Sequence, residues 1–224
     1  RALRAGVELR VFDKGRGPGG RLSSRRAQTP FGEARFDHGA QYVTARGSGF
    51  ASALREAEAA GAAACWDAHL VRLDAAGAAE PLADEPRWVG VPGMNGIVRA
   101  LQDGLDVRYG HRATHIEGGA GAWVVVFEDG TRDGPFTHVA LTLPPVQLAA
   151  FLRASDGVHA ELLAEAQAAS LAPCWALMAA WPAPLTLGFD AAKIATGPIR
   201  WAARMPSRPG RAELEAWVLH AGPD

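Results

Sequence analysis

The sequence predicts a mixed α/β fold, α+β overall, in which half of a dinucleotide-binding unit is interleaved with a domain of mixed sheet and helices. Three observations support this. A helix end, a glycine, a short strand and an acidic residue follow one another over residues 1–13. Strand-like and helix-like segments then alternate over residues 50–170. Beyond Pro173, three strand-like runs follow without a helix between them, as expected for a separate sheet.

The composition is typical of a globular protein. Hydrophobic residues make up 48% of the 224 residues, charged residues make up 21%, and the net charge is −1. These values argue against disorder and against a nucleic-acid partner. No apolar run reaches the ~18 residues of a membrane span, and no secretory signal is visible, so we expect a cytoplasmic protein without a membrane partner. Cys65 and Cys174 lack a partner motif, and we expect two buried thiols.

The N-terminal segment predicts the second half of a Rossmann-type βαβ unit. Residues 1–6 indicate the last turn of a helix closed by Gly6, and residues 7–13 indicate a strand. An acidic residue ends the second strand of such a unit, and Asp13 stands at that place. We therefore expect the first strand and its glycine loop to lie upstream of Arg1.

The other elements follow from hydrophobic periodicity and from turn and capping residues. The Asp129-Gly130 pair predicts a hairpin turn, and Pro144-Pro145 predicts the end of a strand. Asn95 is the expected N-cap of a helix. The predicted helices span residues 50–60, 96–103, 146–153 and 159–170, and the predicted strands span residues 112–116, 123–128, 136–143, 174–181, 199–204 and 214–220.

The chemistry is concentrated in residues 11–44. Residues 15–20 satisfy the G-x-G-x-x-G pattern, but a Rossmann fingerprint must open a helix with an apolar face, and Leu22 is the only apolar residue among the next six. The favoured interpretation has Asp13 accepting hydrogen bonds from an adenosine ribose and Arg21 lying near pyrophosphate oxygens. From the residues alone, a solvated strand end for Asp13 and a surface salt bridge for Arg21 are equally well supported.

A resemblance extends this interpretation. Residues 12–22, 25–26 and 36–42 resemble the signature of bacterial renalase-like flavoproteins, a branch of the flavin amine oxidase superfamily. The resemblance extends over essentially the whole chain. Shorter matches support it at residues 89–95, 143–147, 173–177 and 201–204. The chain departs from the usual pattern with Asp13 in place of Glu and Val43 in place of Phe.

The resemblance implies FAD as the cofactor and a division into two domains. Residues 1–47 and 91–150 would form the FAD-binding domain, and residues 48–90 and 151–224 the substrate-binding domain. Family members continue at both ends, so the resemblance implies truncation at both ends. A chain without the glycine loop is expected to bind FAD poorly and to be inactive, because the helix N-terminus that neutralises phosphates would be absent.

The resemblance also implies roles for individual residues. Asp13 would hold the ribose, Gly20 and Arg21 would lie along the pyrophosphate, and backbone near Ala113 would face adenine. The implied cofactor-binding residues are Asp13, Lys14, Gly19, Gly20, Arg21, His38, Gly39, Ala40, Gln41, Pro92, Gly93, Met94 and Ala113. The candidate catalytic residues are His38, Gln41 and Asn95, and the candidate substrate-pocket residues are Tyr42, Trp175 and Trp201.

Other interpretations of these residue types are weaker. His38 is a candidate catalytic base, but a hydrogen-bonding role is favoured over a proton shuttle because a flavin accepts the hydride itself. His111 and His115 are spaced as helical metal ligands but lie in strand-like sequence without a companion, so no metal is expected. The basic residues of the motif favour an anionic cofactor or substrate over nucleic acid. For Trp175 and Trp201, core packing is slightly favoured over lining a flavin pocket.

The expected activity is that of an FAD-dependent oxidase. A reduced small-molecule substrate would give a hydride to the flavin, and O2 would reoxidise the flavin and yield H2O2. The renalase-like resemblance suggests dihydronicotinamide isomers of NAD(P)H as substrates, whereas the superfamily suggests a small amine. A non-catalytic FAD- or nucleotide-binding protein is the alternative from another functional class.

Overall fold

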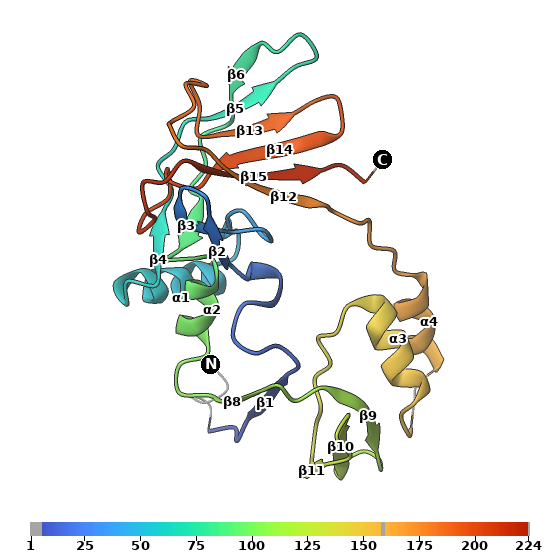
Figure 1. Ribbon diagram of the computed structural model, residues 1–224. Helices are drawn as coiled ribbons and strands as arrows, with labels where there is room; N and C mark the ends of the chain where they lie inside the picture. Colours follow the sequence, from blue (N-terminus) through green and yellow to red (C-terminus); the bar gives the residue numbers. More distant parts are fainter. Residues whose placement is uncertain (1–5, 158–159, 224) are drawn as a thin grey trace. The chain divides into compact units, whose positions relative to one another are not determined.

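The computed structural model describes residues 6–157 and 160–223. The chain divides into two units, each built from two separate segments. Unit 1 comprises Arg1–Gly17 and Gly104–Ala172, and unit 2 comprises Pro18–Asp103 and Pro173–Asp224. The colours of Figure 1 show how the chain leaves unit 1 and returns to it. This interleaving of mixed sheets and helices confirms the predicted fold class, while the functional division into two domains stays a prediction.

Unit 1 contains a parallel strand pair at its beginning. Strand β1 (Arg10–Asp13) pairs in parallel with β8 (Asp106–Tyr109), and Asp13 lies opposite Tyr109. A three-stranded antiparallel sheet follows in the order β11-β10-β9, and helices α3 and α4 complete the unit. These elements span Ala113–Glu117 (β9), Trp123–Phe127 (β10), Arg132–Phe136 (β11), Pro145–Arg153 (α3) and Ala160–Ala168 (α4).

Aromatic packing and ion pairs join these parts of unit 1. The rings of Phe12 on β1 and Phe127 on β10 have centroids 4.9 Å apart. Asp133 on β11 accepts hydrogen bonds from the guanidinium groups of Arg10 and Arg108. Because Arg10 and Arg108 lie on the two parallel strands, this carboxylate ties the pair to the antiparallel sheet.

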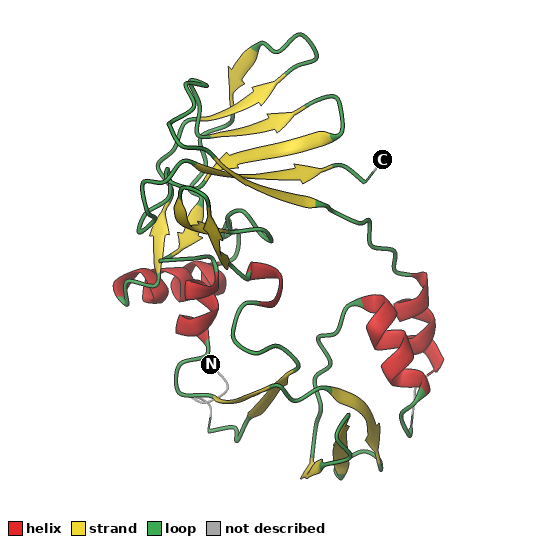
Figure 2. Cartoon of the chain, in the orientation of Figure 1, coloured by secondary structure: helices red, strands yellow, loops and turns green. Residues whose placement is uncertain are grey.

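Unit 2 is built on a six-stranded sheet in the order β12-β15-β14-β13-β5-β6, which Figure 2 shows as the large group of yellow arrows. The β13–β5 pair is parallel, and the other pairs are antiparallel. Its strands span Leu70–Leu73 (β5), Ala79–Pro81 (β6), Ala176–Ala180 (β12), Ala191–Ile194 (β13), Ile199–Arg204 (β14) and Ala216–Ala221 (β15).

Unit 2 also contains several smaller elements. These are the hairpin β2 (Arg25–Thr29) and β3 (Gly32–Phe36), the pair β4 (Ala63–Cys65) and β7 (Trp88–Gly90), the helices α1 (Ser48–Ala59) and α2 (Asn95–Leu101), and the short 3₁₀ turn η2 (Gly20–Leu22). Of these, β3 contacts β15 of the six-stranded sheet. Leu54 and Ala57 are three residues apart on α1 and therefore face the same way, into a core shared with Val89 and Val218. This core is the support for the site described below.

Several predicted elements are confirmed. The helix predicted over residues 50–60 is α1, the helix over 146–153 is α3, and the helix over 159–170 corresponds to α4. The Asp129-Gly130 turn joins β10 and β11, with φ of 82° at Gly130. Strands β9, β10, β12, β14 and β15 lie within a few residues of the predicted ranges. Residues 1–5 of the predicted N-terminal helix end lie outside the described residues.

Other expectations were wrong at specific places. The first strand begins at Arg10, and Val7 and Leu9 before it are exposed. The strand predicted over residues 136–143 keeps only Phe136, because Val139 and Leu141 pack against the aromatic core without pairing to a strand. Their alternating pattern thus indicates burial and not strand pairing.

The helix predicted at Asn95 differs at both ends. Met94 is the N-cap of α2, without a side-chain hydrogen bond, and Asn95 is the first helical residue. The helix ends at Leu101 instead of residue 103.

Cys65 and Cys174, expected to be buried, are exposed. Among the described residues, no helix is both long and apolar enough to cross a membrane.

The core position of Leu54 leads to a stability prediction. Leu54 is 0% exposed, whereas Leu101 on α2 is 46% exposed. We expect Leu54→Ala to lower the free energy of unfolding by about 2–5 kcal/mol, because the deletion leaves a cavity. Leu101→Ala, with the same change in side chain, should cost less than about 1 kcal/mol. Urea denaturation followed by circular dichroism measures both, and equal losses would contradict this description of the core.

Candidate functional site

The carboxyl end of β1 carries the candidate ribose-binding residue of unit 1. Asp13 Oδ1 accepts a hydrogen bond from the backbone N–H of Gly15 at 2.7 Å. The backbone N–H groups of His111 and Gly110 bond to the carbonyls of Asp13 and Gly15 at 3.1 and 2.8 Å. Asp13 therefore ends a parallel strand, as predicted, and its carboxylate is held at the turn that follows. No other donor from the described residues bonds to this carboxylate.

Two more predicted cofactor-binding residues lie in unit 1. Lys14 is exposed, and its Nζ donates to Gln147 Oε1 on α3 at 3.4 Å. Ala113 begins β9 and lies opposite Phe127 of β10. Ala113 packs against the same aromatic cluster that contains Phe12 of β1. Their proposed contacts with FAD stay predictions.

The glycine-rich segment does not open an α-helix. Gly20 begins the three-residue turn η2, and φ is 140° at Gly19 and 50° at Gly20. A Cβ on Gly19 would lie 2.8 Å from Ser23 Cα, so the turn requires a glycine here. The segment is therefore not the first turn of a Rossmann unit, in agreement with the favoured interpretation.

A buried carboxylate organises the candidate site of unit 2. Asp37, directly after β3, is 0% exposed, and its Oδ2 accepts hydrogen bonds from Arg208 Nη1 at 2.7 Å and from Arg211 Nη2. Its Oδ1 accepts from Ser24 Oγ and from the backbone N–H of Met94 at 3.0 Å. Four segments far apart in sequence thus meet at one side chain, which we call the Asp37 hub.

The charges of the hub stabilise one another. Burial alone would raise the pKa of Asp37, but Arg208 and Arg211, with the bonds from Ser24 and Met94, outweigh it and hold this pKa below its usual value. Burial lowers the pKa of Arg208 to about 10, against the opposing effect of Asp37. Both partners are consequently charged at neutral pH, and the buried ion pair is intact.

Gln41 is bonded entirely within the protein. Its Nε2 donates to the carbonyls of Asp37 at 2.5 Å and Gly39 at 3.0 Å. Its Oε1 accepts from Arg208 Nη2 at 2.8 Å and from Trp201 Nε1 at 3.1 Å. A side-chain amide has two N–H donors and one carbonyl acceptor, so all its groups are used. Gln41 therefore links the backbone of residues 37–39 to Arg208 and Trp201, and its predicted catalytic role stays a prediction.

His38 leaves one ring nitrogen without a partner. Its Nδ1 is buried and makes no hydrogen bond with the described residues, and its Nε2 lies 3.4 Å from Ser23 Oγ. The His38 carbonyl accepts from His220 Nε2 at 3.0 Å. Burial lowers the pKa of His220, and Arg208 and His38 lower it further, while the bond to the His38 carbonyl opposes the shift. His220 is therefore a neutral donor that fixes the His38 backbone.

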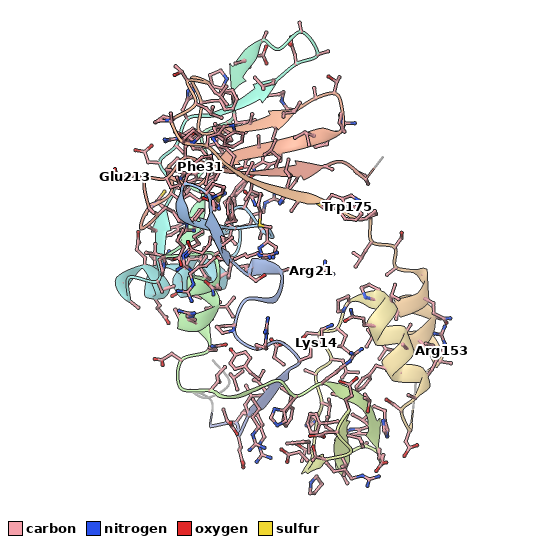
Figure 3. All side chains as sticks on the ribbon, viewed as in Figure 1. Lys14, Arg21, Phe31, Arg153, Trp175 and Glu213 are labelled. Carbon is pink, nitrogen blue, oxygen red and sulfur yellow. The ribbon has the colours of Figure 1, made fainter. Side chains whose placement is uncertain are left out.

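Glycines bring three backbone segments close together in unit 2. A Cβ on Gly39 would lie 2.1 Å from the carbonyl oxygen of Arg21, which accepts from the Ala40 N–H at 2.8 Å. A Cβ on Gly93 would lie 2.5 Å from Ser24 Oγ. The structure therefore places the predicted residues near 21, 38–41 and 93–94 together, while the Arg21 side chain itself is exposed (Figure 3).

The remaining predicted site residues divide into two groups. Tyr42 and Trp201 lie at the hub, with ring centroids 5.8 Å apart, and Trp201 is buried. Trp175, by contrast, is 80% exposed just before β12 (Figure 3), so the core packing favoured for it was wrong. Asn95 is partly buried at the start of α2, and Pro92 is exposed.

Sequence reasoning missed part of the hub. Arg208 and Arg211 flank Pro209-Gly210 in a loop without a recognised motif, and Ser24 and His220 lay in segments assigned no role. The sequence shows two arginines three residues apart in this loop, and nothing in that spacing identifies Asp37 as their partner. The described residues contain no group of three or more His, Cys, Asp or Glu side chains arranged to hold a metal ion.

The hub predicts a strong effect of one arginine on stability. Removing the Arg208 guanidinium leaves Asp37 buried with one ion-pair partner fewer and also removes a bond to Gln41. We expect Arg208→Ala to lower the free energy of unfolding by about 3–5 kcal/mol. Arg46→Ala, at an exposed position, should change it by less than about 1 kcal/mol. Chemical denaturation compares the two variants, and a loss no larger than that of Arg46→Ala would show that the hub is dispensable.

Comparison with known proteins agrees with this architecture. Residues 1–57 match a family model described as an NAD(P)-binding Rossmann-like domain. Wild-type putrescine oxidase, in a structure described as bound to putrescine, superposes with a TM-score of 0.70 at 11% identity, over 98% of this chain and 71% of that one. A putative protoporphyrinogen oxidase from Exiguobacterium sp. 255-15 gives 0.62 at 9% identity, over 97% and 72%. The chain therefore contains a Rossmann-like dinucleotide-binding segment and has the fold of these oxidases.

Proposed function

We propose that this chain is an FAD-dependent oxidoreductase that oxidises a small molecule. The observation that carries the proposal is the Asp13 carboxylate at the carboxyl end of β1, in a parallel strand pair. An acidic residue at this position of a Rossmann-like unit binds the ribose of a dinucleotide. The family-model match over residues 1–57 and the likeness in fold to two oxidases support the same conclusion.

The residues present fit FAD in each unit. In unit 1, Asp13 uses one bond to Gly15 and keeps acceptor capacity for ribose hydroxyls. In unit 2, the buried Nδ1 of His38 has no hydrogen-bond partner among residues 6–157 and 160–223, and Gly39 and Gly93 leave no space for a side chain. We assign Asp13 to the ribose and the segment around His38 and Gly39 to the isoalloxazine. Backbone N–H groups and an imidazole are suitable hydrogen-bonding partners for a flavin ring.

The roles of the chain's own residues follow from their bonds. His38 would hydrogen-bond a bound ligand through Nδ1, while His220 and Ser23 fix its backbone and Nε2. Gln41, predicted as catalytic, would act by positioning this segment, because its amide is fully bonded inside the hub. When bound, FAD would supply the hydride acceptor, with O2 as the final oxidant and H2O2 as the product.

Two substrate classes follow from different observations. The motif resemblance to renalase-like flavoproteins supports dihydronicotinamide isomers of NAD(P)H. The fold likeness to putrescine oxidase supports a small amine. The exposed Arg16, a basic residue of the motif that is not assigned to the FAD pyrophosphate, favours a phosphate-bearing substrate, because a guanidinium binds phosphate with paired hydrogen bonds. We therefore place the dihydronicotinamide class first.

Cofactor binding is tested at Asp13. Asp13→Asn keeps an acceptor for the Gly15 N–H but loses the charge, so we expect FAD to bind about five- to tenfold more weakly. Glu8→Gln, the same change at an exposed carboxylate before β1, should leave the affinity unchanged. Titration of the apoprotein of the full-length chain with FAD, followed by flavin fluorescence, measures both. The assignment of Asp13 would be wrong if both variants bound FAD as the unaltered protein does.

The reaction is tested with the FAD-loaded protein in air. We expect release of H2O2 with dihydronicotinamide isomers of NAD(P)H and little or none with small amines such as putrescine. Release of H2O2 with small amines and not with the dihydronicotinamide isomers would instead identify the protein as an amine oxidase. A flavin that keeps its yellow colour with both classes under anaerobic conditions would indicate a non-catalytic FAD-binding protein and would end the oxidoreductase proposal.

A further inference from the structure

Unit 2 contains a groove that the proposed flavin site does not use. It has a volume of about 350 Å³ and lies between the hairpin β2–β3 and the edge strand β12. Its lining residues are Arg25, Ala27, Gln28, Thr29, Pro30, Phe36, Met178 and Ala180. In Figure 3, the label of Phe31 marks the tip of this hairpin. The volume lies in the range of small-molecule sites.

The register of the hairpin places a positive charge beside an apolar surface. Arg25 pairs with Phe36, and Ala27 pairs with Ala34. Directly opposed residues of an antiparallel pair lie on the same face, so Arg25 shares the inner face with Phe36. Arg26 is the next residue along β2 and lies on the opposite face. The Arg25 side chain therefore lines the groove, whereas the Arg26 side chain points away from it.

The floor of the groove is apolar and partly built from small side chains. Phe36 belongs to the main core of unit 2, and Ala27, Met178 and Ala180 pack against that core. Met178 and Ala180 are two residues apart on β12 and therefore point to the same side of the sheet. The alanines leave room, and a methionine sulfur makes favourable contacts with aromatic rings. This floor suits a flat apolar molecule.

The rim offers one cationic donor group. No carboxylate of the described residues forms an ion pair with Arg25, whose side chain is exposed. Among the other polar groups, Thr29 Oγ1 donates to the Gly32 carbonyl at 2.7 Å, and Gln28 is an uncharged amide whose Nε2 donates to Glu33 Oε2 at 3.5 Å. A guanidinium presents several N–H donors in a plane that matches a carboxylate, sulfonate or phosphate.

From this arrangement we propose that the groove binds a small aromatic molecule that carries one anionic group. The ring would lie on Ala27, Met178 and Ala180, and the anion would bond to the Arg25 guanidinium. The proposal goes beyond the proposed function, because none of the lining residues is assigned to FAD and binding requires no flavin.

The test uses two fluorescent probes that differ in charge. Anilinonaphthalene sulfonate has an aromatic body and one anionic group, and phenylnaphthylamine is its uncharged analogue. We expect the sulfonate to bind the flavin-free protein with a fluorescence increase. Arg25→Gln should weaken the sulfonate about tenfold, the effect of one lost charge-assisted bond, and leave the uncharged probe unchanged. Arg26→Gln, the matched change on the other face, should affect neither probe.

A second variant tests the floor. Ala180→Phe fills the groove from β12, and we expect it to weaken both probes at least fivefold, with the near-ultraviolet circular dichroism spectrum used to confirm the fold. Equal effects of Arg25→Gln and Arg26→Gln on the sulfonate, or no binding of the sulfonate to the unaltered protein, would overturn the proposal. If Ala180→Phe misfolds, sulfonate binding by Arg25→Gln and Arg26→Gln still tests the proposal, because both arginines are exposed and do not contribute to core packing.

Discussion

The interaction on which unit 2 depends is the buried ion pair between Asp37 and the two arginines Arg208 and Arg211. A carboxylate taken out of water is stable only if its oxygens are fully paired, and here both oxygens receive two donors each. The donors come from the segment after η2, from the start of α2 and from the loop before β15. None of these segments can move away without leaving a buried charge, so the pair fixes the backbone around residues 37–41 in one arrangement.

This constraint explains why most polar side chains of the motif at residues 36–42 form hydrogen bonds within the protein. The side-chain polar groups of Asp37 and Gln41 are hydrogen-bonded inside the protein, and Gly39 is needed for the close approach of the Arg21 carbonyl. Within the described part of the chain, the buried Nδ1 of His38 has no hydrogen-bond partner. Residues 37–41 thus form a rigid support in which most polar side-chain groups are bonded within the protein. The fully bonded amide of Gln41 supports the positioning role proposed for it, and its catalytic role stays a prediction.

Local signals in the sequence predicted the local structure well. Helix α1 with its closing Gly61 and the Asp129-Gly130 hairpin depend on neighbouring residues, and both were predicted. Helix α3 was predicted from residue 146 and begins at Pro145. The Asp37–Arg208 pair joins residues 171 positions apart, and no periodicity or spacing in one sequence contains that information. The segment after Phe136 shows the same limit. Its alternating apolar residues correctly indicated burial, but whether a strand pairs depends on a partner elsewhere in the chain.

The hub and the groove lie on opposite sides of the same backbone, because successive side chains at the end of β3 point in opposite directions. Phe36 ends β3 with its side chain in the core and at the groove floor, and Asp37, the next residue, turns its carboxylate to the opposite side, toward Arg208. The Asp37 N–H also contacts Met205 Sδ, so the backbone at this junction is held from both sides. A ligand on Phe36 would therefore rest on a surface whose position is set by the hub, one peptide unit away. Because the hub holds this junction with several buried bonds, we expect the walls of the groove to be ordered without a ligand, and a preformed site binds a rigid aromatic ligand without the entropic cost of ordering its own walls.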